Sequence, residues 1–279
     1  VRGCSCRGTA GFAHVSCLVR QAQVAVAEAE ERGLGGDAFN ARWDRWDTCR
    51  LCEQNYHSFV ACALGWACWK TYVGRPETDR LRSPAMRVLG NGLHDAARHE
   101  DALRVDEAVF STMKRLGASE EQLLDAQGSL ACTYGELGQL EECLSMERDV
   151  YSGSVKLCGE EHASTILAAN NYADSLNVLK RFEEAKSLLR RTIPAARRVL
   201  RDSNELMLKM RRIYVEALYK ADRATLDDLR EAVTTLEDAE RIARRVLGGT
   251  HPLTAGIEND LRNAWAALRA RETPPPGSS

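Results

Sequence analysis

The chain repeats itself at intervals of 41 to 47 residues, and this repeat restricts the possible folds more than any other feature. Three segments align without gaps: AARHEDALRVDEAV, LGQLEECLSMERDV and LKRFEEAKSLLRRT. In them the small residues Ala102, Cys143 and Ala185 fall in register, each after two acidic residues. A fourth segment, DDLREAVTTLEDAE, places Ala232 47 residues further on, with an insertion expected over 221–227. A repeat of this length is typical of stacked supersecondary units.

Within a copy the apolar residues recur at helical spacing. The third copy carries two such stripes, Ile166, Ala169, Ala173 and Leu176, then Phe182, Ala185, Leu189, Ile193 and Ala196. Each copy therefore predicts a hairpin of two helices of about 15 residues, whose small residue lets the paired helices approach closely. Glycines predict helix ends at Leu116–Gly117, Cys158–Gly159 and Leu247–Gly248. A single hairpin cannot bury its apolar face, so the copies should stack.

Composition excludes several classes of protein. Hydrophobic residues make up 44% and charged residues 28%, which argues against a wholly disordered chain. The net charge is -2, and the basic run RRTIPAARRVLR lacks interleaved aromatic residues, so no nucleic-acid partner is expected. The most apolar stretch, FVACALGWACW over 59–69, is too short to span a membrane and predicts a buried helix. With no signal peptide visible, we expect a cytoplasmic protein.

Ten cysteines are present, and six fall within the first 62 residues. Three ligand pairs stand out by their spacing, Cys4-x-Cys6, His14-x2-Cys17 and Cys49-x2-Cys52. Zinc takes four tetrahedral thiolate or imidazole ligands, so three pairs supply one and a half zinc sites. Without a secretory signal, clustered cysteines favour metal binding over disulfides. The alternative is that these are ordinary buried thiols, as expected for Cys62, Cys68, Cys132, Cys143 and Cys158.

The segments CSCRGTAGFAHVSCL and CRLCEQNY resemble the last three ligand pairs of the RING-CH finger of membrane-associated ubiquitin ligases. The resemblance implies that Cys4, Cys6, Cys49 and Cys52 bind one zinc, and that His14 and Cys17 form half of a second site. The family's remaining pair would lie upstream of Val1. The spacer before Cys49 is longer than in the family and should hold a helix over 15–33, ended by glycines. The tryptophan usual after the third pair is absent.

The RING-CH resemblance also implies a partner and an activity. In such ligases a hydrophobic surface near the zinc binds a ubiquitin-conjugating enzyme. The ligase itself works by positioning that charged partner, so no residue of this chain would perform covalent chemistry.

The repeats resemble the tetratricopeptide repeat in its kinesin-light-chain-like form. The segment 162–193 is the closest copy, LGGTHPLT matches the signature between repeats, and Pro194 departs from the pattern because it should kink its helix. The resemblance implies that the first helix of each hairpin lines a concave face that binds a protein or peptide. The candidate partner-binding residues are Asn170, Asn171, Arg190, Arg191, Arg211 and Arg212.

The two asparagines would hydrogen-bond an extended peptide backbone, and the arginines would supply charge for an acidic ligand. The alternative is that the asparagines satisfy an adjacent turn and that the arginines form a solvated helix face.

The sequence thus predicts a mostly α-helical chain that begins with a small zinc-binding, RING-like module and continues as an α-solenoid. The expected boundaries are a truncated RING-CH finger with a trailing helix over 1–72, a linker over 73–84, the repeat array over 85–271 and a disordered tail over 272–279. The predicted function is a RING-CH-type ubiquitin ligase or ligase adaptor whose repeats bind a protein. The alternative is a non-enzymatic scaffold with a structural zinc module.

Overall fold

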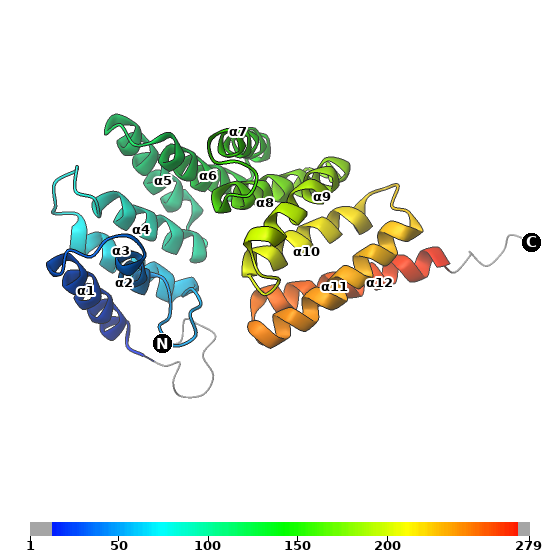
Figure 1. The fold of residues 1–279 in the computed structure, drawn as a ribbon, viewed down its shortest axis with the longest axis horizontal. Coiled ribbons are helices and arrows are strands. Elements are labelled where there is room, and N and C mark those ends of the chain that lie inside the picture. Colours follow the sequence, from blue (N-terminus) through cyan, green and yellow to red (C-terminus); the bar gives the residue numbers. More distant parts are fainter. Residues whose placement is uncertain (1–12, 273–279) are drawn as a thin grey trace, which may run out of the picture. The chain divides into compact units, whose positions relative to one another are not determined.

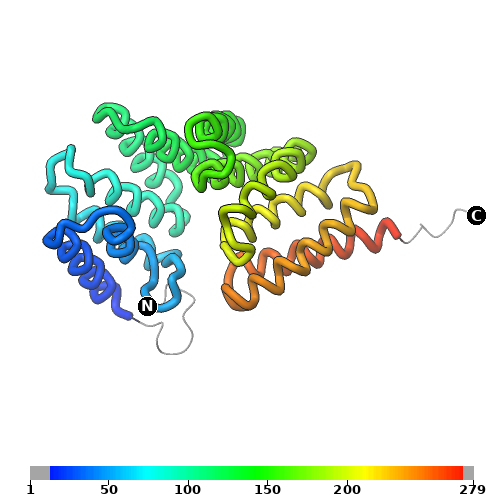
Figure 2. The backbone as a smooth tube through the Cα atoms, in the orientation of Figure 1, coloured from blue at the N-terminus to red at the C-terminus, as the bar shows by residue number. Residues whose placement is uncertain are grey.

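The computed structural model describes residues 13–272, in which all regular secondary structure is helical. The chain divides into two compact units, the first ending at Leu137 and the second beginning at Gly138 (Figure 1). In the second unit successive helices are joined by short connections, whereas longer loops precede α3 and α4 in the first unit, as the backbone trace in Figure 2 shows. The mostly helical fold expected from the repeats is therefore confirmed for the described part of the chain.

The first unit contains six α-helices and one short 3-10 helix within its described residues. They are α1 (Val15–Glu31), α2 (Gly36–Trp43), η2 (Asp44–Trp46), α3 (Ser58–Tyr72), α4 (Arg82–Asp95), α5 (His99–Arg115) and α6 (Glu120–Glu136). The helix predicted over 15–33 is confirmed as α1, which ends just before Gly33, a residue with φ of +61°. The apolar stretch 59–69 is confirmed as part of α3, whose Leu64 and Cys68 are fully buried.

Helices α3 and α4 approach each other at glycines. A Cβ atom added at Gly65 of α3 would lie 2.8 Å from the carbonyl oxygen of Val88. One added at Gly92 of α4 would lie 2.6 Å from the carbonyl oxygen of Ala61. Since the neighbouring atoms belong to the backbone, neither position has room for a side chain.

The second unit forms a single apolar core between its helices. They are α7 (Leu140–Cys158), α8 (Ala163–Val178), α9 (Phe182–Val199), α10 (Glu205–Lys220), α11 (Leu226–Val246) and α12 (Pro252–Glu272). Each helix packs against the next along the chain, and α10 also packs against α8 and α12. Helix α9 continues through Pro194 to Val199 and is not ended by that residue.

The small residues that defined the repeat are buried as predicted. Ala102, Cys143 and Ala185 are each the fourth residue of their helix, α5, α7 and α9, and all are buried. Ala232 is also buried, but it is the seventh residue of α11. The insertion at 221–227 therefore lengthens both the loop before α11 and the first turn of that helix.

Turns between helices require left-handed backbone at repeat-related positions. Ala97, Gly138 and Lys180 have φ of +55°, +79° and +58°, and they are spaced like the buried small residues. The predicted helix ends are confirmed as well, since Gly117, Gly159 and Gly248 follow α5, α7 and α11 with positive φ. These turns explain why glycine recurs with the period of the repeat.

Residues 73–84, which were predicted as a linker, contact neighbouring helices in the structure. It contains a loop over 73–81 and the first residues of α4. In this loop Arg75 donates two hydrogen bonds of 2.8 Å to the carboxylate of Glu30, and its guanidinium lies 4.8 Å from the ring centroid of Tyr72. The loop thus fastens α1 to α3, and helices on both sides of it belong to one unit.

The glycine contacts generate a stability prediction. We expect Gly65→Ala and Gly92→Ala each to lower the free energy of unfolding of the first unit by about 1–3 kcal/mol, because the added methyl group forces packed backbones apart. Chemical denaturation followed by circular dichroism measures this. Gly74→Ala is the control, since nothing lies within 4 Å of that position and its φ is not left-handed. Equal stabilities for all three variants would contradict the proposed close approach.

Candidate functional site

On α8 of the second unit, exposed apolar side chains and polar side chains share one face of the helix. Leu167 and Val178 are 49% and 53% exposed, which is high for large apolar residues. Half-buried Asn171 and exposed Asp174 lie between them at helical spacing, so the four side chains share one face. Helix α8 is the first helix of its hairpin, and α10, the first helix of the next hairpin, packs beside it. This stripe, Leu167, Asn171, Asp174 and Val178, is the candidate binding stripe.

Arg212 holds α10 against α12. Its Nε donates to Oδ2 of Asp260 over 2.6 Å, and Tyr219 OH donates to Oδ1 of the same carboxylate over 3.3 Å. The Arg212 guanidinium lies against Gly256, where an added Cβ would come within 3.0 Å of its carbon atom. Asp260 is only 6% exposed, so one buried carboxylate on α12 anchors two side chains of α10.

The charge of Arg212 is matched by carboxylates from three helices. Burial lowers the pKa of Arg212, but the hydrogen bond to Asp260 and the negative charges of Asp260, Glu216 and Asp174 outweigh burial and raise it. Burial and the charge of Asp260 likewise raise the pKa of Tyr219. Arg212 is therefore always charged, and the surrounding carboxylates offset its positive field.

The two predicted asparagines differ in exposure. Asn170 is 7% exposed and donates through Nδ2 to Oδ1 of Asn171 over 3.2 Å. Asn171 is half-buried and belongs to the candidate binding stripe. A third asparagine was not predicted from the sequence. Asn177 is buried and donates to the carbonyl of Ile213 over 2.8 Å, which links α8 to α10. Its position four residues after the apolar stripe residue Ala173, on the same helix face, was the available signal.

All four predicted arginines bind other side chains of the second unit, Arg212 through Asp260 as described above. Arg190 donates through Nε to Tyr214 OH over 2.9 Å, and Arg191 donates through Nη2 to Tyr151 OH over 2.8 Å. Arg211 is buried and forms an ion pair with Asp202. The structure therefore places Arg190 and Arg191 on α9, the second helix of the hairpin, and brings only Asn171 and Arg212 to the face shared by α8 and α10.

The predicted zinc ligands are only partly described. Cys4 and Cys6 lie outside the described residues. His14 precedes α1 and Cys17 lies in its first turn, both exposed, with the Cys17 N–H donating to the carbonyl of His14 over 3.0 Å. Within residues 13–272 no three predicted ligands, out of His14, Cys17, Cys49 and Cys52, converge to metal-binding distance.

The Cys49-x2-Cys52 segment is a closed turn. The Cys49 N–H donates to the carbonyl of Gln54, and the Glu53 N–H donates to the carbonyl of Cys49, both over 2.9 Å. Glu53 has φ of +54°, a left-handed conformation that reverses the chain directly after Cys52. Cys49 is buried in an apolar cluster, against which Cys52 and Leu18 of α1 also pack. A reversed turn that carries two thiols fits one half of a tetrahedral metal site.

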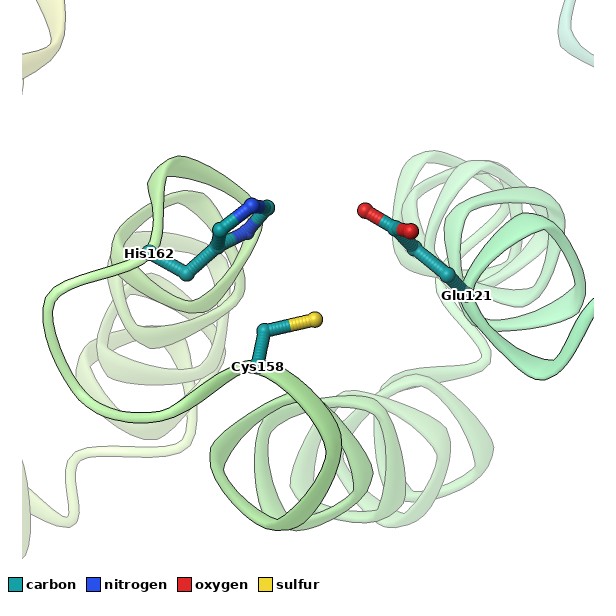
Figure 3. Close-up of side chains that lie close together, drawn as sticks. All are labelled: Glu121, Cys158 and His162. Carbon is teal, nitrogen blue, oxygen red and sulfur yellow. The ribbon is translucent and has the colours of Figure 1, made fainter.

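Figure 3 shows Cys158 at the end of α7 and His162 immediately before α8. Within the second unit the pair Cys158 and His162 supplies two donors, which is half a zinc coordination shell. His162 Nδ1 accepts a hydrogen bond from the Ser164 N–H over 3.3 Å.

The remaining cysteines differ in burial from what the sequence predicted. Cys132 is exposed and Cys158 is only half-buried, so the expectation that both are core residues was wrong. Burial is confirmed for Cys62, Cys68 and Cys143.

Comparisons with known proteins agree with the repeat fold. The tetratricopeptide repeat family model matches residues 123–164. That match covers one repeat-length segment of the chain. No curated protein sequence matches it significantly. No helix within the described residues is long and apolar enough to cross a membrane.

Three solved structures share the fold. One is a kinesin light chain repeat protein from Podospora anserina, with 22% identity, a TM-score of 0.56, and coverage of 68% of this chain and 88% of the other. BtubC from P. vanneervenii has 14% identity and a TM-score of 0.51, with 96% and 97% covered. A Rap protein complexed with competence and sporulation factor has 12% identity and a TM-score of 0.50, with 91% and 66% covered.

The Arg212–Asp260 pair generates a second stability prediction. We expect Asp260→Asn to lower the free energy of unfolding of the second unit by about 1–3 kcal/mol, because half-buried Arg212 loses its charged partner. Denaturant melts of the whole chain measure this. Asp238→Asn is the matched control, since its ion pair with Arg241 lies on an exposed surface of α11 and should contribute well under about 1 kcal/mol. Identical losses in both variants would contradict the anchoring role of Asp260.

Proposed function

We propose that the chain is a protein-interaction scaffold whose second unit binds an extended peptide segment along the candidate binding stripe of α8. The observation that carries the proposal is the exposure of Leu167 and Val178 on one helix face, with the polar side chains of Asn171 and Asp174 between them. The Rap protein, which shares the fold, was solved with competence and sporulation factor bound, and this supports a binding role for such repeats.

The spacing of the stripe suggests the size of the ligand. Leu167 and Val178 are eleven residues apart, or about 16 Å along the helix axis. An extended peptide rises about 3.3 Å per residue, so a segment of about five residues spans both. Its apolar side chains would contact Leu167 and Val178, while the Asn171 amide would hydrogen-bond its backbone.

The charge balance argues against the acidic ligand that the arginines suggested. Arg211 is buried in an ion pair, and the positive charge of Arg212 is offset by Asp174, Glu216 and Asp260. Exposed Asp174 adds negative charge on the stripe itself. We therefore propose a neutral or basic peptide with two apolar anchors.

Substitution of a stripe residue tests this function. We expect Leu167→Lys to weaken binding of peptides selected from a random library on the intact chain by tenfold or more, because a charge replaces an apolar anchor. Leu157→Lys is the matched control, since Leu157 is 44% exposed but lies on α7, a second helix of a hairpin. Fluorescence anisotropy of labelled peptides measures the affinities. Equal loss in both variants, or in neither, would refute the stripe as the binding surface.

We also propose a zinc-binding role for the N-terminal part of the chain. The closed turn carrying Cys49 and Cys52 supports it, because the turn is held by its own backbone hydrogen bonds and is packed against α1. Cys4 and Cys6 would complete this site, and His14 and Cys17 would supply half of another. The zinc would act as a structural cross-link between the chain that precedes α1 and the turn that precedes α3.

A ubiquitin-ligase function is the second candidate, favoured by one observation. Leu51, within the Cys49-x2-Cys52 turn, is 68% exposed, and Phe59, in the first turn of α3, is 69% exposed. Exposed apolar residues of this size beside a zinc turn would suit contact with a ubiquitin-conjugating enzyme. Without such contact, the zinc module would serve the scaffold alone.

Zinc content separates these possibilities. Elemental analysis of the purified chain should find one zinc per molecule, and Cys49→Ser should remove it while Cys132→Ser, an exposed cysteine outside the predicted sites, should not. Absence of zinc from the unsubstituted chain would reject both the finger and the ligase.

If zinc is present, an autoubiquitination assay follows, in which Leu51→Ala should lower activity without zinc loss. An inactive zinc-loaded chain would leave the scaffold function alone.

A further inference from the structure

A groove lies between α11 and α12 in the second unit (Figure 1). Two ion pairs show that these helices lie antiparallel. Arg244 of α11 is 2.9 Å from Glu258 of α12, and Arg230, nearer the start of α11, is 3.2 Å from Glu272 at the end of α12. The groove has a volume of about 400 Å³, which is in the range of ligand pockets. No residue of the candidate binding stripe lines it.

The α12 wall of the groove carries an aromatic side chain between two arginines. Arg262, Trp265 and Arg269 follow one another at helical spacing and therefore lie on one face of α12. Trp265 is 36% exposed, and the guanidinium of Arg269 lies over its ring, 5.6 Å from the centroid. Leu261 and Ala266 add apolar surface beside it. This wall thus combines apolar surface with positive charge.

The carboxylates that line the groove are already bound to a third arginine. Arg244 donates through Nε to Glu240 over 2.6 Å, and its Nη2 lies 2.9 Å from Glu258. The lining as a whole carries three arginines and two glutamates, a net charge of +1. The excess positive charge therefore belongs to the α12 wall.

Arg262 and Arg269 keep donors free for a ligand. Arg262 is exposed and donates to the side-chain oxygen of Asn259 over 3.2 Å. Arg269 is exposed and contacts the Trp265 ring. Within residues 13–272 neither guanidinium forms an ion pair. Since each guanidinium has five N–H donors, both can still bind a carboxylate.

The charge and spacing of this wall favour a particular ligand. An uncharged occupant would remove water from two guanidiniums and return no partner, whereas carboxylates would replace that water with charge-assisted hydrogen bonds. Arg262 and Arg269 are seven residues apart, or about 10 Å along the helix axis. Side chains three residues apart on an extended peptide span about the same length.

We propose that the groove between α11 and α12 binds an acidic peptide segment with two carboxylate side chains three residues apart. The carboxylates pair with Arg262 and Arg269, and an apolar side chain between them packs against the part of Trp265 that Arg269 leaves open. This ligand is opposite in charge to the neutral or basic peptide proposed for the candidate binding stripe. The second unit then carries two sites with different charge preference, and neither proposal depends on the other.

Fluorine NMR of the intact chain labelled with 5-fluorotryptophan tests this binding. The other four tryptophans lie in the first unit, and Trp265→Phe assigns the Trp265 resonance. The probe is the blocked peptide Gly-Glu-Leu-Ala-Glu-Gly, and its control is Gly-Gln-Leu-Ala-Gln-Gly, which has the same size without the charge. The acidic peptide should shift the Trp265 resonance saturably and leave the other four unchanged. The control peptide should bind at least tenfold more weakly.

Arginine substitutions locate the contact. We expect Arg262→Gln and Arg269→Gln each to weaken binding of the acidic peptide at least fivefold and to reduce its advantage over the control peptide. Arg271→Gln is the matched control, because Arg271 is exposed on the same helix but does not line the groove. It removes the same charge and should leave the affinity unchanged. Circular dichroism verifies that each variant is folded.

Four results would overturn the proposal. An unmoved Trp265 resonance at millimolar acidic peptide would mean that the groove does not bind it. Equal affinity for the two peptides would mean that charge is not recognised. Equal loss from Arg262→Gln and Arg271→Gln would mean that the attraction comes from the general charge of α12. Displacement of the peptide by an equal concentration of sulfate would mean that the groove holds any small anion.

Discussion

Close approach of neighbouring helices at small residues is the packing constraint on which both units depend. In the first unit, Gly65 and Gly92 each face a backbone carbonyl of the other helix, with no room for a Cβ atom. In the repeats, buried Ala102, Ala185 and Ala232 take the equivalent role with a single methyl group. Side chains of this size allow backbones to pack directly, so the apolar stripes on either side can interdigitate.

Polar groups in the second unit are used mostly to join helices. Arg212 and Tyr219 meet on Asp260, and Asn177 binds the backbone of α10. Buried charged groups are tolerable only when paired, and the Arg212–Asp260 pair also links two helices. The consequence for binding is that the charges of Arg211 and Arg212 are already matched within the unit. The apolar residues that stay exposed, Leu167 and Val178, therefore define the candidate surface better than the arginines do.

Much of the fold could be predicted from the sequence alone, but the candidate binding stripe could not. The helix ends at Gly117, Gly159 and Gly248 were predictable because left-handed backbone selects glycine. Ala97 and Lys180 occupy the equivalent positions in other turns, and their backbone is also left-handed. Because neither residue is a glycine, the sequence does not predict this conformation. Arg211 and Arg212 are neighbours of identical type, yet one is buried and the other lines a surface. Their burial differs because different parts of the structure lie opposite the two side chains. The periodicity of the sequence does not predict which part that will be.

The sequence by itself determined the repeat, the helical periodicity and the position of the small residues, because these follow from local backbone preferences and from spacing along one helix. Tertiary structure decided which polar side chains serve the fold and which face solvent, because this depends on partners elsewhere in the chain, such as Asp260, which lies 48 residues from Arg212. It also decided that the loop 73–81 fastens helices together, since the carboxylate that binds Arg75 comes from α1, far earlier in the chain.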